Sequence, residues 1–197
     1  MWNFVKTANV GGEFMTPEAQ ARIAEIGARR LNLAGEECPL LSEQEIYNLN
    51  IAKGTLTDEE RQIINNHIVV TIKMLESLPF PKHLRNVPEF AGGHHERMDG
   101  KGYPRGLTRE QMSIQARCMG IADIFEALTA KDRPYKEGKK LSEALRIMGF
   151  MKKEGHIDPD LFDIFVKERL YLRYAKEFLD PSQIDEVDPA KIPGYTG

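Results

Sequence analysis

Residues 94–104 are the most informative part of this chain, and they read His94-His95-Glu96-Arg97-Met98-Asp99-Gly100-Lys101-Gly102-Tyr103-Pro104. Two adjacent imidazoles and two carboxylates precede a tight turn of glycine and proline. Imidazole and carboxylate groups are the ligands that non-haem iron, manganese and zinc prefer. Because the 197-residue chain has only 5 histidines, this concentration indicates one wall of a hydrolytic metal site.

The composition is that of a globular protein rather than of a membrane protein or a nucleic-acid binder. Hydrophobic residues make up 41% and charged residues 29% of the chain, and the net charge is −3. This charge argues against a nucleic-acid polymer as a partner, and no apolar run approaches the roughly 20 residues of a membrane span. Cys38 and Cys118 form neither a zinc pattern nor a disulfide framework, which favours a reducing cytoplasm.

Helix signals recur along the chain, whereas strand signals are nearly absent. Capping residues followed by apolar residues at helical spacing predict helices at 17–31, 42–54, 57–78, 82–97, 113–130, 142–153 and 158–178, with loops at 32–41 and 99–107. This pattern is typical of an all-α bundle, here of about six or seven helices. The bulky residues Trp2, Phe4 and Val5 read as the middle of a helix, so we expect the bundle to be incomplete at its N-terminus.

Three histidines are candidates for a shared site. His67 stands at helical spacing from the apolar residues around it, so the pattern predicts that it points into the core. A histidine there is either a packed core residue or a metal ligand, and this stretch alone leaves both open. His94 shares the apolar stripe of its predicted helix, and His95 is rotated by about 100° from it. The pair stands at the C-terminal end of that helix, where the partial negative charge favours a bound cation.

Asp123 is the fourth candidate. It stands among apolar residues in the stretch 120–125, where a carboxylate is costly unless it is paired. It is therefore either a metal ligand or the partner of an arginine such as Arg117 or Arg133.

Two loops carry cations beside an aromatic ring. Lys101, Tyr103 and Arg105 stand in the turn 99–106, and residues 132–136 read Asp132-Arg133-Pro134-Tyr135-Lys136. Taken alone, each loop is a turn that connects helices. Beside a divalent cation, the same residues suit phosphate oxygens and a stacked base. Together with the histidines they favour a metal-dependent phosphohydrolase.

With these motifs in view, the chain resembles the HD-GYP domain family of bacterial cyclic-di-GMP phosphodiesterases, a branch of the HD metal-dependent phosphohydrolases. The resemblance extends from about Asn9 to Glu186. It rests on ordered segments at 54–57 with His67, at 94–104, at 121–129 and at 132–136.

What the resemblance implies is an HD-domain-like helical bundle that holds about two or three iron or manganese ions and hydrolyses cyclic di-GMP in the cytoplasm. The positions that match the family's metal ligands are His67, His94, His95 and Asp123. Those that match its name-giving motif and its contacts to substrate phosphates are Gly102, Tyr103, Pro104, Arg133 and Lys136. We expect Glu96 and Asp99 to contact these residues without touching the metal or the substrate themselves.

One departure concerns the His-Asp dyad that gives the superfamily its name, and the Gly-Lys after it that supplies a catalytic lysine. No His-Asp pair occurs in the sequence, and no histidine precedes His67. We therefore assign no catalytic residue, and we expect fewer metal ions and weak or absent activity in this polypeptide by itself. The expected parts are a segment resembling an insertion of the family at 1–56, the HD-GYP core at 57–179 and a weakly ordered tail at 180–197.

Three interpretations remain open. The first is the C-terminal part of a longer cyclic-di-GMP phosphodiesterase, either a fragment or a natural remnant. The second is a non-catalytic module with a degenerate metal site, which binds a cyclic dinucleotide or docks on a diguanylate cyclase domain. The third is a helical scaffold whose histidines only pack. Apolar surface left uncovered would also favour a homodimer.

Overall fold

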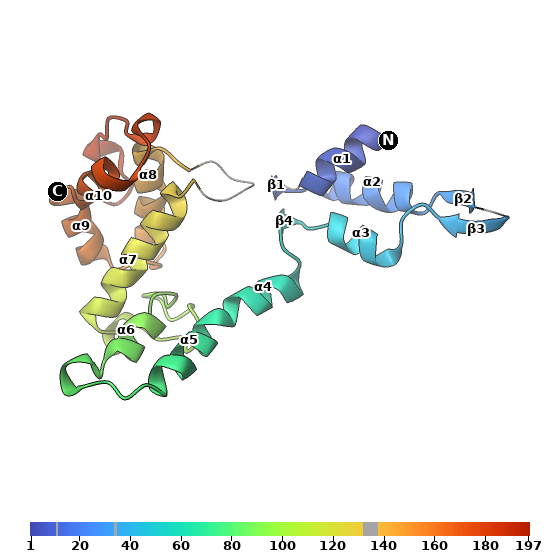
Figure 1. Ribbon diagram of the computed structural model, residues 1–197. Coiled ribbons are helices and arrows are strands. Elements are labelled where there is room, and N and C mark those ends of the chain that lie inside the picture. The colour runs from blue at the N-terminus through green and yellow to red at the C-terminus, as the bar shows by residue number, and fades with distance from the viewer. Residues whose placement is uncertain (11, 34, 132–137) are drawn as a thin grey trace. The chain divides into compact units, whose positions relative to one another are not determined.

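The computed structural model describes residues 1–10, 12–33, 35–131 and 138–197 of the chain (Figure 1). Its contacts separate two compact units, unit 1 at Met1–Asn65 and unit 2 at Asn66–Gly197. Helices predominate in both, which confirms the predicted all-α class. The division lies at 65/66, nine residues after the boundary at 56/57 that the sequence suggested.

Unit 1 combines helices with two small antiparallel sheets. Its helices are α1 (Trp2–Val10), α2 (Pro17–Gly27), α3 (Glu43–Leu49) and α4 (Asp58–Asn65). Strand β1 (Gly12–Phe14) pairs with β4 (Lys53–Gly54), and β2 (Arg30–Leu33) pairs with β3 (Glu36–Pro39). The predicted caps are confirmed, since the side chains of Thr16, Ser42 and Thr57 each accept the backbone N–H three residues on.

The hairpin of β2 and β3 shows that the predicted helix to Leu31 and the predicted loop at 32–41 are wrong. Helix α2 ends at Gly27, where an added Cβ would lie 2.6 Å from Cδ1 of Ile46. The turn of the hairpin uses Asn32, whose side-chain oxygen accepts the N–H of Gly35 at 3.0 Å. Gly35 has a φ of +95°, which glycine adopts without a steric penalty.

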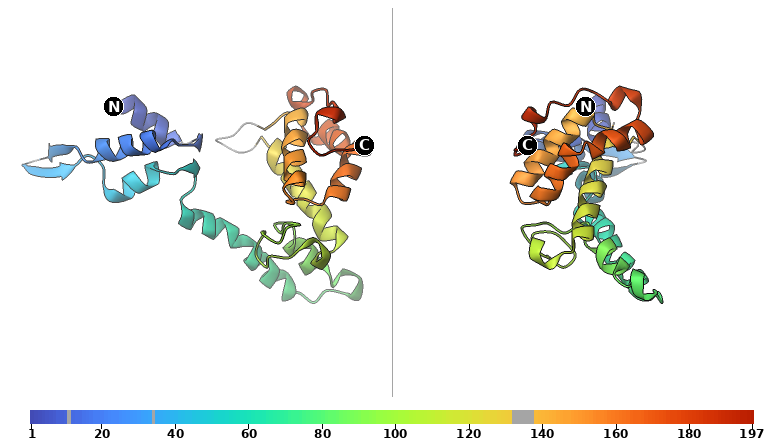
Figure 2. Two further views of the ribbon diagram at one scale, coloured as in Figure 1. Left: turned by 180° about the vertical axis from the view of Figure 1, so that it is seen from behind. Right: turned by 90° about the vertical axis from the view of Figure 1, so that its left-hand side faces the viewer.

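Unit 2 is a helical bundle arranged around α7 (Ile114–Thr129), the longest helix of the described residues. Helix α5 (His67–Glu76) packs on α6 (Val87–Gly92), and α6 packs on α7. The C-terminal half of α7 contacts α8 (Leu141–Lys153) and α9 (Pro159–Lys167), and α9 contacts α10 (Leu170–Phe178) (Figures 1 and 2). Short 3₁₀ turns complete the unit: η1 (Lys82–Leu84), η2 (Arg109–Gln111), η3 (Pro181–Gln183) and η4 (Pro189–Lys191).

The main core of unit 2 lies among α7, α8, α9 and α10. Its largest buried apolar side chains include Phe125, Leu145, Met148 and Phe162. This core holds α7 in place, and the opposite half of α7 is then available to contact the segment that carries the histidine pair.

Two of the predicted helices are divided in the structure, and a third has different ends. Residues 57–78 form α4 and α5, and residues 158–178 form α9 and α10, which are separated at Arg169 with a φ of +51°. The predicted helix at 82–97 is wrong at both ends, because Pro88 stands in the first turn of α6 and Gly92 is its last residue. The described residues therefore form more helices than expected.

The residues after α10 pack on unit 2, although we expected them to be weakly ordered. Gln183 is buried, and its Nε2 donates to the carbonyl oxygens of Thr129 at 2.8 Å and Lys139 at 3.1 Å. The carboxylate of Asp185 accepts both the N–H and the hydroxyl of Ser142. Ser142 is therefore not the N-cap of α8, a position that Lys140 takes.

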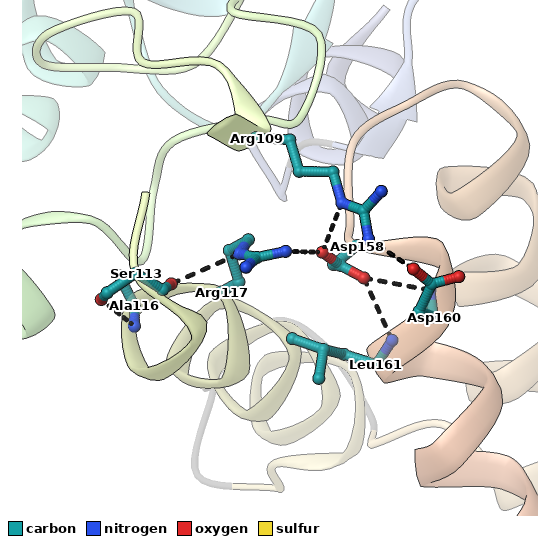
Figure 3. A network of polar contacts seen from close by, with 7 residues as sticks. All are labelled: Arg109, Ser113, Ala116, Arg117, Asp158, Asp160 and Leu161. Carbon is teal, nitrogen blue, oxygen red and sulfur yellow. Dashed lines mark hydrogen bonds and ion pairs between the residues drawn. The ribbon is translucent and has the colours of Figure 1, made fainter. Parts of the chain in front are cut away.

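Asp158 joins three elements of unit 2 through one buried carboxylate (Figure 3). Its Oδ1 accepts the backbone N–H groups of Asp160 at 3.0 Å and Leu161 at 3.1 Å, which caps α9. Its Oδ2 accepts from Nε of Arg109 at 2.9 Å and from the guanidinium of Arg117 on α7. Burial alone would raise the pKa of Asp158, but the N–H of Leu161 and the two guanidinium groups outweigh it and lower the pKa.

Replacing Asp158 with alanine should lower the free energy of unfolding by about 3 kcal/mol, because two guanidinium groups and the N-terminus of α9 lose their acceptor. Urea denaturation followed by circular dichroism measures this. Asp160→Ala is the matched control, since this exposed carboxylate also pairs with Arg109 and should cost no more than about 1 kcal/mol. Equal losses in the two variants would contradict the role of Asp158.

The same carboxylate predicts a pH dependence of stability. Because the pKa of Asp158 is lowered in the folded state, its contribution is present above the ordinary value of about 3.9 and is lost as pH falls below it. Urea midpoints measured from about pH 7 down to pH 3 should therefore fall more steeply in the native protein than in Asp158→Asn. Parallel curves would show that Asp158 carries no such linkage.

Candidate metal centre

Three of the predicted ligands come together in unit 2. One nitrogen from each of His67, His94 and His95 lies within 4.8 Å of the others. Nε2 of His95 is 3.1 Å from Nε2 of His67, and the ring centroids of His94 and His95 are 4.1 Å apart. His67 is the first residue of α5, whereas His94 and His95 lie in the turn just after α6.

Close packing at glycines places the histidine pair between α5 and α7. An added Cβ on Gly92 would lie 2.8 Å from Cγ1 of Ile72 on α5, and one on Gly93 would lie 2.8 Å from Cβ of Ala116 on α7. On α7 itself, an added Cβ on Gly120 would lie 3.2 Å from the carbonyl oxygen of His94. Larger residues at Gly92 and Gly93, where the contacts are tightest, would push the helices apart, and the imidazoles with them.

The hydrogen bonds of the imidazoles indicate which ring nitrogens are open to a cation. Nδ1 of His94 lies 2.6 Å from the carbonyl oxygen of Ala91. Because a carbonyl oxygen only accepts, this contact assigns the hydrogen of a neutral ring to Nδ1 and the lone pair to Nε2. Between His95 and His67 one Nε2 donates to the other, and a divalent cation can take the place of that hydrogen.

Electrostatics keep His95 in the form that binds a cation. Burial lowers the pKa of His95, the nearby His94 lowers it further, and the negative charge of Asp123 opposes both. Burial likewise raises the pKa of Tyr103, and Asp123 raises it further. Asp123 is thus near enough to act on both rings, although it is not a member of the close histidine group.

Two sequence expectations about these residues are wrong in detail. His67 is exposed, and Ile68 and Ile72 take the core positions of α5 instead. Asp123 is exposed too, on a face of α7 that it shares with Met119 and Ala122. Apolar neighbours in the sequence did not signify burial here, because Met119 and Ala122 themselves lie at the surface beside Asp123.

Of the two arginines suggested as partners of Asp123, only Arg117 lies within the described residues. Arg117 pairs with Asp158 rather than with Asp123. Within the described residues, Asp123 makes no hydrogen bond or ion pair. The other suggested partner, Arg133, lies outside the described residues, as does Lys136.

The loop after the histidines folds back onto them. Glu96 is only 4% exposed, and its two oxygens accept the N–H groups of Arg105 at 2.8 Å and Leu107 at 2.9 Å. The ring of Tyr103 stacks on that of His95, with centroids 4.9 Å apart and planes 18° from parallel. The sequence had suggested a supporting role for Glu96 but not its partners. Nearly every residue has a backbone N–H, so the sequence does not show which of them bonds to a given side chain.

Asp99 supports the start of the same loop. Its carboxylate accepts two hydrogen bonds from Arg97 and one from the N–H of Lys101. The hydrogen bond from Arg97 and the N–H of Lys101 lower the pKa of Asp99. The carboxylate therefore stays charged at neutral pH and holds the loop at its first residues.

Comparison with known proteins assigns this arrangement to a family. Residues 42–161, more than half of the chain, match the family described as HD domain. The chain belongs to the HD domain family. The matched part of this HD domain includes His67, His94, His95 and Asp123. It contains no His-Asp pair.

Several characterised proteins are similar to this HD domain chain. A cyclic di-GMP phosphodiesterase of Pseudomonas aeruginosa is 41% identical over 114 residues, which are 58% of this chain and 26% of that protein. A 3'3'-cGAMP-specific phosphodiesterase of Vibrio cholerae is 44% identical over 81 residues, 41% of this chain and 19% of the other. A cyclic di-GMP phosphodiesterase response regulator of Xanthomonas campestris is 29% identical over 172 residues, 82% and 45% of the two chains. The chain thus spans less than half the length of each of these relatives.

No helix among the described residues is both long enough and apolar enough to cross a membrane.

Replacing Gly102 with alanine should disturb the loop, because the new Cβ would lie 2.4 Å from the N of Arg97 and 2.5 Å from Cα of Glu96. We expect a loss of about 1–3 kcal/mol in the free energy of unfolding, measured by urea denaturation. Gly120→Ala is the control, because its closest contact is looser, at 3.2 Å. An unchanged stability for Gly102→Ala would mean that the loop does not need this close approach.

Proposed function

We propose that this chain is the metal-binding part of a phosphodiesterase that hydrolyses cyclic di-GMP. The observation that carries the proposal is the convergence of three imidazoles beside the Gly102-Tyr103-Pro104 loop. Two kinds of relatives support it, since those of Pseudomonas and Xanthomonas are named for cyclic di-GMP and one of Vibrio for 3'3'-cGAMP. A cyclic dinucleotide is the substrate class common to all three names.

The donor set fits a hard or borderline dication. His67, His94 and His95 would hold it, with Asp123 approaching from α7 as the carboxylate ligand. Imidazole with carboxylate suits iron or manganese, and such ions take about five or six donors. When bound, the metal would polarise a phosphoryl oxygen and lower the pKa of water.

The chain's own residues would bind and orient the dinucleotide around this centre. Gly102, Tyr103 and Pro104 would form one wall. Lys101 and Arg105 are exposed, and among the described residues their side chains reach only carboxylates, at 4.0 Å and 3.4 Å, so phosphate oxygens can compete for them. Arg133 and Lys136, outside the described residues, would be further phosphate contacts.

Four ligands are fewer than a complete binuclear site requires. We therefore propose that this polypeptide by itself holds at most about one or two ions and hydrolyses slowly. The HD-GYP core at 57–179, a cytoplasmic location, a homodimer and docking on diguanylate cyclase domains belong to the same proposal.

Metal and nucleotide binding by the full chain test the proposal. After incubation with Mn²⁺ or Fe²⁺ and gel filtration, the protein should retain metal, and Asp123→Asn should lower the retained amount without changing the helical circular dichroism signal. Glu126→Gln is the matched control, an exposed carboxylate one turn further along α7. Retention equal to that of a triple alanine variant of the histidines would overturn the metal site.

Hydrolysis of cyclic di-GMP, followed by separation of the products, is the second measurement. Slow metal-dependent turnover that Asp123→Asn reduces supports the enzyme. Tight binding of cyclic di-GMP with no turnover under any metal would favour the non-catalytic module instead.

A further inference from the structure

Glu96 is a buried carboxylate without a cation. It is 4% exposed, and within the described residues it makes no ion pair. A buried carboxylate costs free energy unless hydrogen bonds compensate it. Among the described residues, the N–H groups of Arg105 and Leu107 provide these hydrogen bonds. Glu96 therefore stabilises the conformation of the loop.

The loop makes several contacts with residues 95–97, where it begins. Besides the two bonds to Glu96, the N–H of Tyr103 donates to the carbonyl oxygen of His95 at 3.2 Å. At Gly102 the backbone approaches Glu96 and Arg97 so closely that a Cβ has no room. The position of Tyr103 is therefore determined by residues 95 and 96.

The ring of Tyr103 restrains His95 in addition to the contact of its Nε2 with His67. In His94, Nδ1 is held by the carbonyl oxygen of Ala91, the usual way in which a protein orients an imidazole ligand. Nδ1 of His95 has no hydrogen-bond partner among the described residues. The rings around His95 are those of His94, tilted by 46°, of His67, edge-on at 85°, and of Tyr103, which alone is nearly parallel at 18°.

We propose that Glu96 is a positioning residue for the metal centre. Its carboxylate clamps the loop at residues 105 and 107, the clamped loop sets Tyr103 against His95, and the stacked ring orients the His95 imidazole toward His67. The inference deepens the proposed function and rests on it for the metal, whereas the orientation of His95 exists without any ion.

The first test therefore measures the orientation in the metal-free protein. In the full chain labelled with ¹³C in its histidine rings, stacking should shift the Cε1–H signal of His95 upfield through the ring current of Tyr103. Tyr103→Phe should keep this shift, and Tyr103→Leu should lose it. Glu96→Gln should also lose it, because one of the two N–H groups then faces an amide nitrogen that cannot accept.

Glu89→Gln is the matched control for Glu96→Gln. Glu89 also accepts a backbone N–H, that of Ser113 at 3.2 Å, and among the described residues it makes no hydrogen bond to the loop. It should keep the shift. A normal shift in a folded Glu96→Gln protein would overturn the proposal, and so would a normal shift in Tyr103→Leu.

The second test measures the affinity for Co²⁺ by its visible absorption. Glu96→Gln and Tyr103→Leu should each bind about tenfold more weakly or worse than the native chain, with Tyr103→Phe and Glu89→Gln unchanged. Native affinity in Glu96→Gln would overturn the positioning role while leaving the metal site intact. If the native chain binds no Co²⁺, the proposed function fails, and the shift of His95 decides by itself whether Glu96 positions that ring.

Discussion

Close helix contact at Gly92 and Gly93 is the constraint on which the rest of unit 2 depends. These two residues end α6 and lie against Ile72 of α5 and Ala116 of α7. The chain leaves α6 at that point, so the next two side chains, His94 and His95, follow directly after the contacts of α6 with both α5 and α7. His67, the first residue of α5, is then close enough for its imidazole to contact them. His67 and His94 are 27 residues apart in the sequence. Close packing at the glycines brings one nitrogen of each, and one of His95, within 4.8 Å of one another.

The two halves of unit 2 are stabilised by different means. The helices α7 to α10 share a large apolar core, and Asp158 adds a buried polar junction to it. The loop after His95 has no such core and is held mainly by carboxylates that accept backbone N–H groups. Fixed dipoles and short hydrogen bonds can hold a polar loop beside a charged centre, where apolar packing would exclude substrate.

The sequence predicted what depends on local chemistry. Caps such as Thr16, Ser42 and Thr57 bond within three residues, so a short window contains the whole interaction. The adjacent histidines of the candidate site were likewise visible as a motif. Their ligation of a metal, together with that of Asp123, stays a prediction.

What the sequence did not predict depends on distant partners. The hairpin at 30–39 was predicted as the end of a helix followed by a loop, although Asn32 and Gly35 form its turn. Asp123 was expected to be buried because its neighbours are apolar, but burial is decided by what packs on α7. The role of Glu96 was hidden for a further reason, since its partners are the N–H groups of residues 105 and 107.

The packing of the C-terminal residues has a consequence for a segment far from them in sequence. Gln183 joins the carbonyl oxygens of Thr129 and Lys139, and Asp180 forms an ion pair with Lys131 at 2.8 Å. The chain departs from α7 and returns to α8 between these points, and Arg133 and Lys136 lie in the span that they enclose. Residues 180–183 therefore hold both described ends of this stretch, so that Gln183→Ala would loosen the exit from α7 and the approach to α8 together.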